Sequence, residues 1–208
     1  MSKQIKPWPV FLILALLLAL PAAGCQPGGS QSTVTPEPSE SSPVFEHEVH
    51  VRIPAEEPTD LEPGLYCLTA LNGDGLFHLL AADRNQTDPV RVQAFRQRAW
   101  VEVRQGEILR YKGAKVETEE EREMQGCYPV TLRDGFFRIG LDIFPGMLTV
   151  TGGQADGETP VCEIYASAHD LAGGPLRTYE LKDSLNYIQV SEGEYLYLWG
   201  AEAYIPPT

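Results

Sequence analysis

Apolar and polar side chains alternate on both sides of two glycine-containing turns, at residues 105–106 and 192–193. The apolar positions are Val101, Val103, Leu109 and Tyr111 around the first turn, and Ile188, Val190, Leu196 and Leu198 around the second. A period of two is typical of strands with one buried face, and a short turn between two such runs predicts a hairpin. Further short runs are separated by Gly, Pro, Asn and Asp, which favours an all-β sandwich.

The two turns belong to an internal repeat. Residues 103–114 and 190–201, which are 87 positions apart, are identical at six of twelve positions. Upstream, residues 63–69 match 145–151 at an offset of 82. Offsets that differ by a few residues indicate loop insertions within one duplicated unit.

We therefore expect an all-β fold of two tandem β-sandwich repeats, over residues 44–116 and 126–205. A unit of about 70 residues buries little core on its own, so the copies should pack together, as two small domains or as one pseudo-symmetric pair. Residues 117–125 carry an acidic run with a helical pattern. They are expected to form a linker between the copies.

The N-terminal residues have the three parts of a secretory leader. Two lysines come first, residues 8–20 are apolar, and small residues precede Cys25. A transmembrane helix is the competing interpretation, but a bilayer requires about 20 apolar residues and Pro21 interrupts the stretch sooner. Residues 20–25, Leu-Pro-Ala-Ala-Gly-Cys, resemble the lipobox of bacterial lipoproteins.

This resemblance implies a signal peptide over residues 1–24, cleavage before Cys25, and a diacylglyceryl group on the Cys25 thiol. The implied location is the extracytoplasmic face of the cell membrane, where two acyl chains give stable anchoring. Residues 25–43 are rich in Pro, Ser, Gly and Glu and contain no aromatic residue, which predicts a disordered tether. The folded part should begin near Val44.

The formal net charge of the whole chain is −13. Cleavage removes Lys3 and Lys6 and leaves 14 basic and 29 acidic side chains, so a nucleic-acid partner is not expected. The charge is uneven, because residues 84–116 carry eight basic and three acidic side chains. Anionic polymers, lipid headgroups or the protein's own acids could neutralise this basic face. Its candidate residues are Arg96, Arg98, Arg110 and Lys112.

Three cysteines remain when Cys25 is assigned to the lipid: Cys67, Cys127 and Cys162. Their spacing matches neither a zinc site nor a CxxC redox motif. An odd number permits at most one internal disulfide, and the sequence does not assign it. We expect buried or half-buried thiols.

A two-part motif marks the second copy. Its residues are Gly140, Asp142, Ile143, Pro145 and Gly146, followed by Val190, Gly193, Tyr195, Leu196, Leu198, Gly200 and Ala201. The pattern resembles repeats of surface lipoproteins of Gram-positive bacteria, with Phe144 where alanine is usual, and the first copy lacks the Gly-x-Asp start. The resemblance covers most of residues 126–204 and implies fold and location, but no activity.

Candidate binding residues follow from the pleat of the strands. If the apolar positions around the second turn face the core, the intervening aromatic residues face the other way. Flat aromatic faces suit sugar rings or partner side chains, although the other copy or the second sheet could cover them. The candidates are Tyr187, Tyr195, Tyr197 and Trp199.

No motif for catalysis or for a bound cofactor is present. His47 and His50 fall on opposite faces of a strand, and the HExxH spacing is absent. Asn72, Asp74 and residues 83–88 offer oxygen atoms, but turns explain them better than a calcium loop. The remaining histidines, His78 and His169, accompany no GxSxG or P-loop motif. We therefore expect no catalytic residues, no metal and no cofactor.

The leading hypothesis is a lipid-anchored, non-catalytic binding module for an envelope glycan, polymer or protein. A structural or accessory subunit without a ligand is the second, and an enzyme with an unrecognised site is the third. Exposure of Tyr195, Tyr197 and Trp199 distinguishes the first two.

Overall fold

The computed structural model describes residues 43–52, 60–82, 89–125, 131–153, 159–181 and 186–205. The chain divides into two compact units, Met1–Ser41 and Ser42–Thr208, and every described residue belongs to the second. The leader, Cys25, the tether as far as Ser42, Cys127 and residues 83–88 lie outside the described residues. The expectations for them stay predictions.

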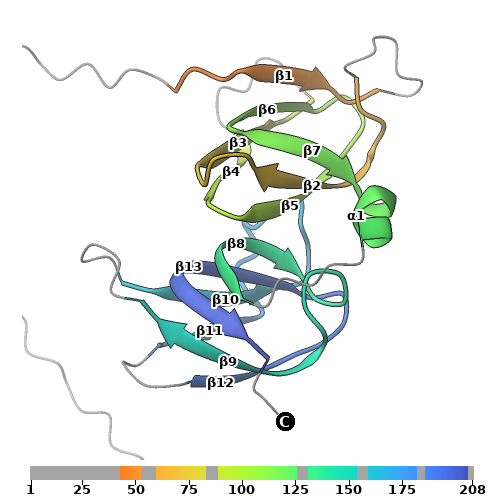
Figure 1. Ribbon diagram of the computed structural model, residues 1–208. Coiled ribbons are helices and arrows are strands. Elements are labelled where there is room, and N and C mark those ends of the chain that lie inside the picture. The colour runs from red at the N-terminus through yellow and green to blue at the C-terminus, as the bar shows by residue number, and fades with distance from the viewer. Residues whose placement is uncertain are drawn as a thin grey trace, which may run out of the picture. The chain divides into compact units, whose positions relative to one another are not determined.

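Strands dominate the described residues (Figure 1). The first half contains β1 (His47–His50), β2 (Gly64–Ala70), β3 (Gly75–Leu80), β4 (Pro89–Phe95), β5 (Arg98–Val103), β6 (Ile108–Lys112) and β7 (Ala114–Thr118), followed by the helix α1 (Glu119–Gln125). The second half contains β8 (Leu132–Arg138), β9 (Gly146–Gly152), β10 (Val161–Tyr165), β11 (Arg177–Tyr179), β12 (Asn186–Val190) and β13 (Tyr195–Tyr204). The expected all-β fold is confirmed.

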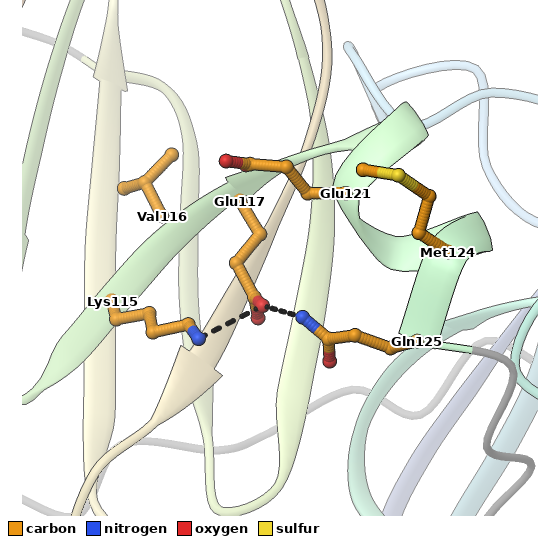
Figure 2. A pocket seen from close by; sticks show the side chains of 6 residues that line it. All are labelled: Lys115, Val116, Glu117, Glu121, Met124 and Gln125. Carbon is orange, nitrogen blue, oxygen red and sulfur yellow. Dashed lines mark hydrogen bonds and ion pairs between the residues drawn. The ribbon is translucent and has the colours of Figure 1, made fainter.

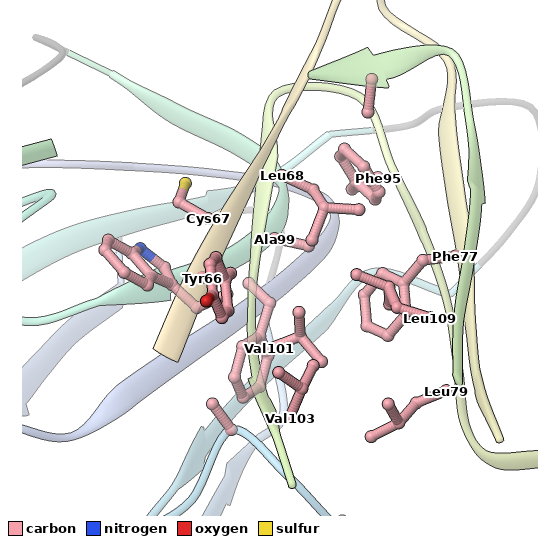
Figure 3. Packing of buried hydrophobic residues seen from close by; sticks show 14 of the residues in the cluster. Tyr66, Cys67, Leu68, Phe77, Leu79, Phe95, Ala99, Val101, Val103 and Leu109 are labelled. Atoms are coloured by element: carbon pink, nitrogen blue, oxygen red, sulfur yellow. The ribbon is translucent and has the colours of Figure 1, made fainter. Parts of the chain in front are cut away.

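Two sheets of the first half enclose a core. The strands β1, β6, β3 and β4 form one sheet in that order, and β5, β2 and β7 are neighbours in the other. Leu68, Ala99 and Val101 project from the second sheet toward Phe77 and Leu109 of the first (Figure 3). All five side chains are fully buried, as alternation predicted for Val101 and Leu109.

Strands of the second half pair in the same order. The strands β8, β13, β10 and β11 are neighbours, while β12 pairs with β9 and β9 pairs with the end of β13. Its core is a separate cluster that includes Leu148, Val150, Ile164, Ile188 and Leu196. A duplication requires such a correspondence, but pairing order alone does not establish one, and the duplication stays a prediction.

The long strand β13 pairs with three strands of its half. Residues 195–198 pair with β8 and β10, residues 202–203 pair with β8 again after a register shift, and residues 201–204 pair with β9, with Gly200 at φ +61°. Gly113, at φ +64°, lies at the corresponding bend between β6 and β7. A Cβ atom at Gly113 would overlap the carbonyl oxygen of Asp74, so this bend requires glycine.

A single pair of residues joins the halves into one nine-stranded sheet, because Ala99 of β5 lies opposite Phe136 of the parallel strand β8. The strand β5 is buried on both faces. Trp100 and Val101 point to opposite sides of it, and both are 0% exposed. Alternation identified only one of these two buried faces.

The predicted turns are present, but the predicted hairpins are wrong. Gly106 and Gly193 have φ values of +86° and +82°. However, the strands on either side of the first turn do not pair: β5 pairs with β2, and β6 pairs with β1 and β3. The strands on either side of the second turn do not pair either, because β12 pairs with β9 and the start of β13 pairs with β8 and β10. The turn at Gly106 therefore crosses between the two sheets, whereas the turn at Gly193 connects two strands of the nine-stranded sheet that do not pair with each other. Alternation reports which face is buried, not which strand is the neighbour.

The helix α1 lies where the acidic run predicted one, but it begins two residues later. Thr118 caps it: the Thr118 hydroxyl accepts the Glu121 N–H at 3.2 Å, and the Glu121 carboxylate accepts the Thr118 N–H at 2.8 Å. Glu117 belongs to β7 and is buried. Arg122 is also buried, 3.8 Å from Asp142 of the second half, so this segment is packed rather than a free linker.

Candidate functional site

The four predicted aromatic contact residues do not form one exposed stripe. Tyr187 lies on β12 and is 63% exposed, whereas Tyr195, on β13, is 8% exposed. Tyr197 and Trp199 are half-buried on β13. Because β12 pairs with β9 whereas the start of β13 pairs with β8 and β10, the two strands are not neighbours there, and the stripe expected from pleating is divided. Their binding role stays a prediction.

Tyr195 and Tyr197 are covered where the two halves meet, beside the pair Ala99 and Phe136; we call this contact region the joint. The Phe136 ring stacks on Tyr195 with 5.4 Å between centroids, and it lies 6.5 Å from the Tyr197 ring. Both tyrosines pack against the core of the first half. Burial raises the pKa of each phenol. These rings close the joint rather than face solvent.

The centre of this joint is Arg91 of β4. One terminal nitrogen of its guanidinium donates to the carbonyl oxygens of Trp100, at 3.0 Å, and Ala168, at 2.6 Å. The guanidinium carbon lies 5.1 Å from the centre of the Phe77 ring and 4.2 Å from that of Phe136. Burial lowers the Arg91 pKa to about 9, so the side chain is cationic at neutral pH.

The predicted basic face is largely neutralised by the protein itself. Lys112 has no ion-pair partner among the described residues. The other three candidates pair with carboxylates: Arg96 with Asp134 at 3.2 Å, Arg98 with Asp142 at 2.5 Å, and Arg110 with Glu48 at 2.6 Å. An anionic partner would have to displace these acids.

Asp142 is a fully buried carboxylate between the halves. It accepts hydrogen bonds from the Trp100 indole at 2.5 Å and from the Arg138 backbone N–H at 2.9 Å, in addition to its ion pair with Arg98. A carboxylate with these partners is a structural link, not an open general base. The aspartate of the Gly-x-Asp motif was the only sequence signal for it.

His169 and Glu107 form a second buried pair across the joint, with 2.7 Å between His169 Nε2 and Glu107 Oε1. The other oxygen of Glu107 accepts the Arg104 backbone N–H at 2.7 Å. His169 Nδ1 is buried without a hydrogen-bond partner. The Ser167 hydroxyl accepts the His169 backbone N–H at 3.1 Å, and among the described residues no hydrogen bond joins a serine or cysteine side chain to the His169 ring, as a nucleophile would require.

The remaining histidines are dispersed. His78 packs on Phe45 with 4.5 Å between ring centroids, and burial, followed by the charge of Arg110, lowers its pKa. His47 stacks on Tyr111 at 4.7 Å. No group of three potential metal ligands occurs among residues 43–52, 60–82, 89–125, 131–153, 159–181 and 186–205.

The two described cysteines are free and buried, as expected for unpaired thiols. Burial raises the pKa of Cys67 and of Cys162 to about 12. Such thiols stay protonated near neutral pH and are poor nucleophiles. Gly73 has φ +82°, and it places Asn72 and Asp74 in a bend, as the turn interpretation requires.

An exposed aromatic surface contains one of the four predicted contact residues, Tyr187, together with residues that the alternation argument did not identify. On the side of β9 away from the core, Thr149 lies opposite Tyr187 of β12 and opposite Tyr204 of β13. Thr149, between the two tyrosines, is 2% exposed, whereas Tyr187 is 63% and the neighbouring Met147 is 48% exposed. We call this surface, made of Met147, Thr149, Tyr187, Gln189 and Tyr204, the outer face of β9.

The first half covers its corresponding surface. There Cys67 of β2 lies opposite Trp100 of β5 and Glu117 of β7, in the same arrangement as Thr149 and its two tyrosines. All three are buried, because α1 packs on β2 and β7 and Trp100 reaches Asp142. The outer face of β9 thus remains open where the corresponding face of the first half is occupied.

Comparisons with protein-family models, with curated proteins and with solved structures gave no significant match. Among the described residues, no helix is long and apolar enough to span a membrane.

Proposed function

We propose that this protein is a lipid-anchored binding module of the cell envelope that holds a neutral glycan on the outer face of β9. The exposed Tyr187 ring, in register with the buried Thr149 and the half-buried Tyr204, carries the proposal. A tyrosine presents a flat apolar ring and a hydroxyl group, which match the faces and hydroxyl groups of a sugar. The anchor at Cys25 rests on the lipobox resemblance.

The charge of the protein favours a neutral glycan over an acidic polymer. The chain has 29 acidic residues against 16 basic ones, so it repels polyanions at a distance. The outer face of β9 contains no basic side chain that would oppose this repulsion. The nearby Arg133 is ion-paired with Glu202 at 2.9 Å.

Binding of the soluble unit Ser42–Thr208 to a panel of neutral polysaccharides, measured by affinity electrophoresis and calorimetry, tests the proposal. Tyr187→Ala should weaken binding about fivefold, since an aromatic contact contributes roughly 1 kcal/mol. Val92→Ala is a matched control, because Val92 is 51% exposed but lies on the first half. Equal binding by the two variants would exclude the outer face of β9 as the site.

A spacer without a ligand is the second candidate, and burial of Tyr195 and Tyr197 at the joint favours it. Under this alternative, the aromatic residues of β13 stabilise the protein and contact nothing else. The unit Ser42–Thr208 would then bind no member of the polysaccharide panel. Tyr187→Ala would also leave its melting temperature unchanged, because Tyr187 is exposed.

A further inference from the structure

The strand β7 forms an open edge of the nine-stranded sheet, because it pairs with β2 on one side and ends the strand order on the other. The Leu71 N–H donates to the Gly113 carbonyl oxygen at 2.9 Å, and this bond fixes the alternation along β7. Lys115 and Glu117 therefore bond toward β2. The backbone groups of Ala114 and Val116 point to the open edge.

These edge groups have no hydrogen-bond partner within the described chain segments. The N–H of Thr118, the next outward position, is already taken by the Glu121 carboxylate at 2.8 Å. Val116, which is half-buried, thus offers one N–H and one C=O group to an added strand, whereas Ala114 is only 4% exposed. An unprotected edge of this kind is a template for pairing with another polypeptide.

A depression flanks this edge on each side of the sheet, and Val116 lines both. The first has a volume of about 300 Å³ and is lined by Val49, Leu61, Tyr111, Glu46, His47 and Glu48. The second has a volume of about 340 Å³ and is lined by Lys115, Glu117, Glu121, Met124 and Gln125, as Figure 2 shows. Successive side chains of an added strand point to opposite faces, so two adjacent residues would enter the two depressions.

Charge identifies the kind of side chain that fits. Four carboxylates line the two depressions: Glu48 is ion-paired with Arg110 at 2.6 Å, and Glu46 and Glu121 have no ion-pair partner among the described residues. Lys115 is engaged by Glu117 at 3.0 Å, and Glu117 also accepts from Gln125 at 2.6 Å (Figure 2). Burial opposes ionisation of Glu117, but hydrogen bonds from Gln125, Lys115 and Thr69 outweigh it and lower its pKa. The apolar walls suit the hydrocarbon stem of a lysine or arginine, and the acidic rims suit its cationic end.

We propose that the open edge of β7 binds an extended basic segment of a partner protein as an added strand, with two adjacent Lys or Arg side chains in the two depressions. The chain's own tether does not fit, since residues 26–43 contain four prolines and no Lys or Arg. A second copy fits less well, because two acidic α1 helices would meet.

The probe is the fluorescein-labelled peptide Thr-Val-Thr-Arg-Arg-Thr-Val-Thr, titrated into Ser42–Thr208 and followed by anisotropy. The same peptide with Glu-Glu at its centre is the control. We expect saturable binding of the Arg-Arg peptide that weakens with added salt, and no binding of the Glu-Glu peptide. Equal binding of both peptides would overturn the proposal, as would self-association of the chain without peptide binding.

Val116→Pro removes the outward N–H without removing a bond to β2, and Val116→Thr keeps that N–H in a side chain of similar shape. The proline variant should weaken binding about tenfold or more, and the threonine variant should bind nearly as the parent does. Hydrogen exchange on the unmodified protein is independent of the variants' folding. The Val116 amide should become protected when peptide is added, and an unchanged exchange rate would refute strand addition. Neither readout involves the outer face of β9.

Discussion

The guanidinium carbon of Arg91 lies 4.2 Å from the centre of the Phe136 ring, and this contact joins a strand of the first half to a strand of the second. No carboxylate pairs with Arg91 among the described residues. Aromatic faces, two backbone carbonyl oxygens and the Gln93 side-chain oxygen, at 3.2 Å, hold the charge instead. Packing and hydrogen bonds around the Arg91 guanidinium therefore stabilise the joint, rather than an ion pair.

Arg91→Ala should reduce the free energy of unfolding by about 3 kcal/mol, because it leaves a cavity and two unsatisfied carbonyl oxygens. Arg91→Met should cost less, since it keeps most of the buried volume without the charge. Urea denaturation of both variants measures the difference. Equal losses would show that the charge, not the packing, stabilises the joint.

Asp142→Asn should destabilise the protein by about 3–5 kcal/mol, because it leaves the Arg98 guanidinium without its buried carboxylate. Equilibrium denaturation followed by tryptophan fluorescence measures the loss. Glu202→Gln is the control: its ion pair with Arg133, at 2.9 Å, is exposed and should contribute less than about 1 kcal/mol. A loss of similar size in the control would contradict the structural role given to Asp142.

Gly113→Ala should cost about 2–5 kcal/mol, because it combines a positive φ with overlap against the Asp74 carbonyl oxygen. At Gly73, with φ +82°, a Cβ atom would meet nothing, so Gly73→Ala should cost only about 1 kcal/mol. Thermal denaturation of the pair measures both. If the costs are equal, the bend between β6 and β7 does not require glycine.

The thiols of Cys67 and Cys162 should lower stability at alkaline pH. In the folded protein the pKa of each is about 12, from a usual value of 9.0, so the unfolded chain loses these protons first. The stabilisation is complete below pH 9 and is lost as pH rises toward about 12. Denaturant titrations over this range should show a shallower decline in the free energy of unfolding for Cys162→Ala than for the parent protein.

Iodoacetamide at pH 8 should leave the thiols of Cys67 and Cys162 unmodified until the protein unfolds. Rapid labelling of the native state would contradict their burial.

Cys25→Ser should abolish incorporation of a labelled fatty acid, because the thiol is the proposed attachment atom. Metabolic labelling in a lipoprotein-processing bacterium, followed by membrane fractionation, measures the effect. Cys162→Ala is the matched control and should remain labelled and membrane-bound. Labelling of the serine variant would place the acyl group elsewhere.

Local pattern predicted the strand class and many buried positions, because the pleat depends only on neighbouring residues. It identified Val103, Leu109, Ile188 and Leu198 as inward-facing, and the structure buries all four. It did not identify strand partners. The turn at Gly106 suits a hairpin or a crossing between sheets equally, and contacts distant in sequence determine which one forms.

The aromatic site was misplaced for a similar reason. Tyr195 lies on the side of β13 away from its own core, as pleating requires, but the Phe136 ring stacks on it and it packs into the core of the first half. Thr149 carries no aromatic signal of its own. Its two tyrosines come from β12 and the end of β13, and only the register of three strands brings them together.

The strand β13 pairs with three strands of the second half, β8, β9 and β10. It is also the last strand described. Until β13 is in place, β8, β9 and β10 each lack one of their neighbours, so the second half cannot close before this strand has paired.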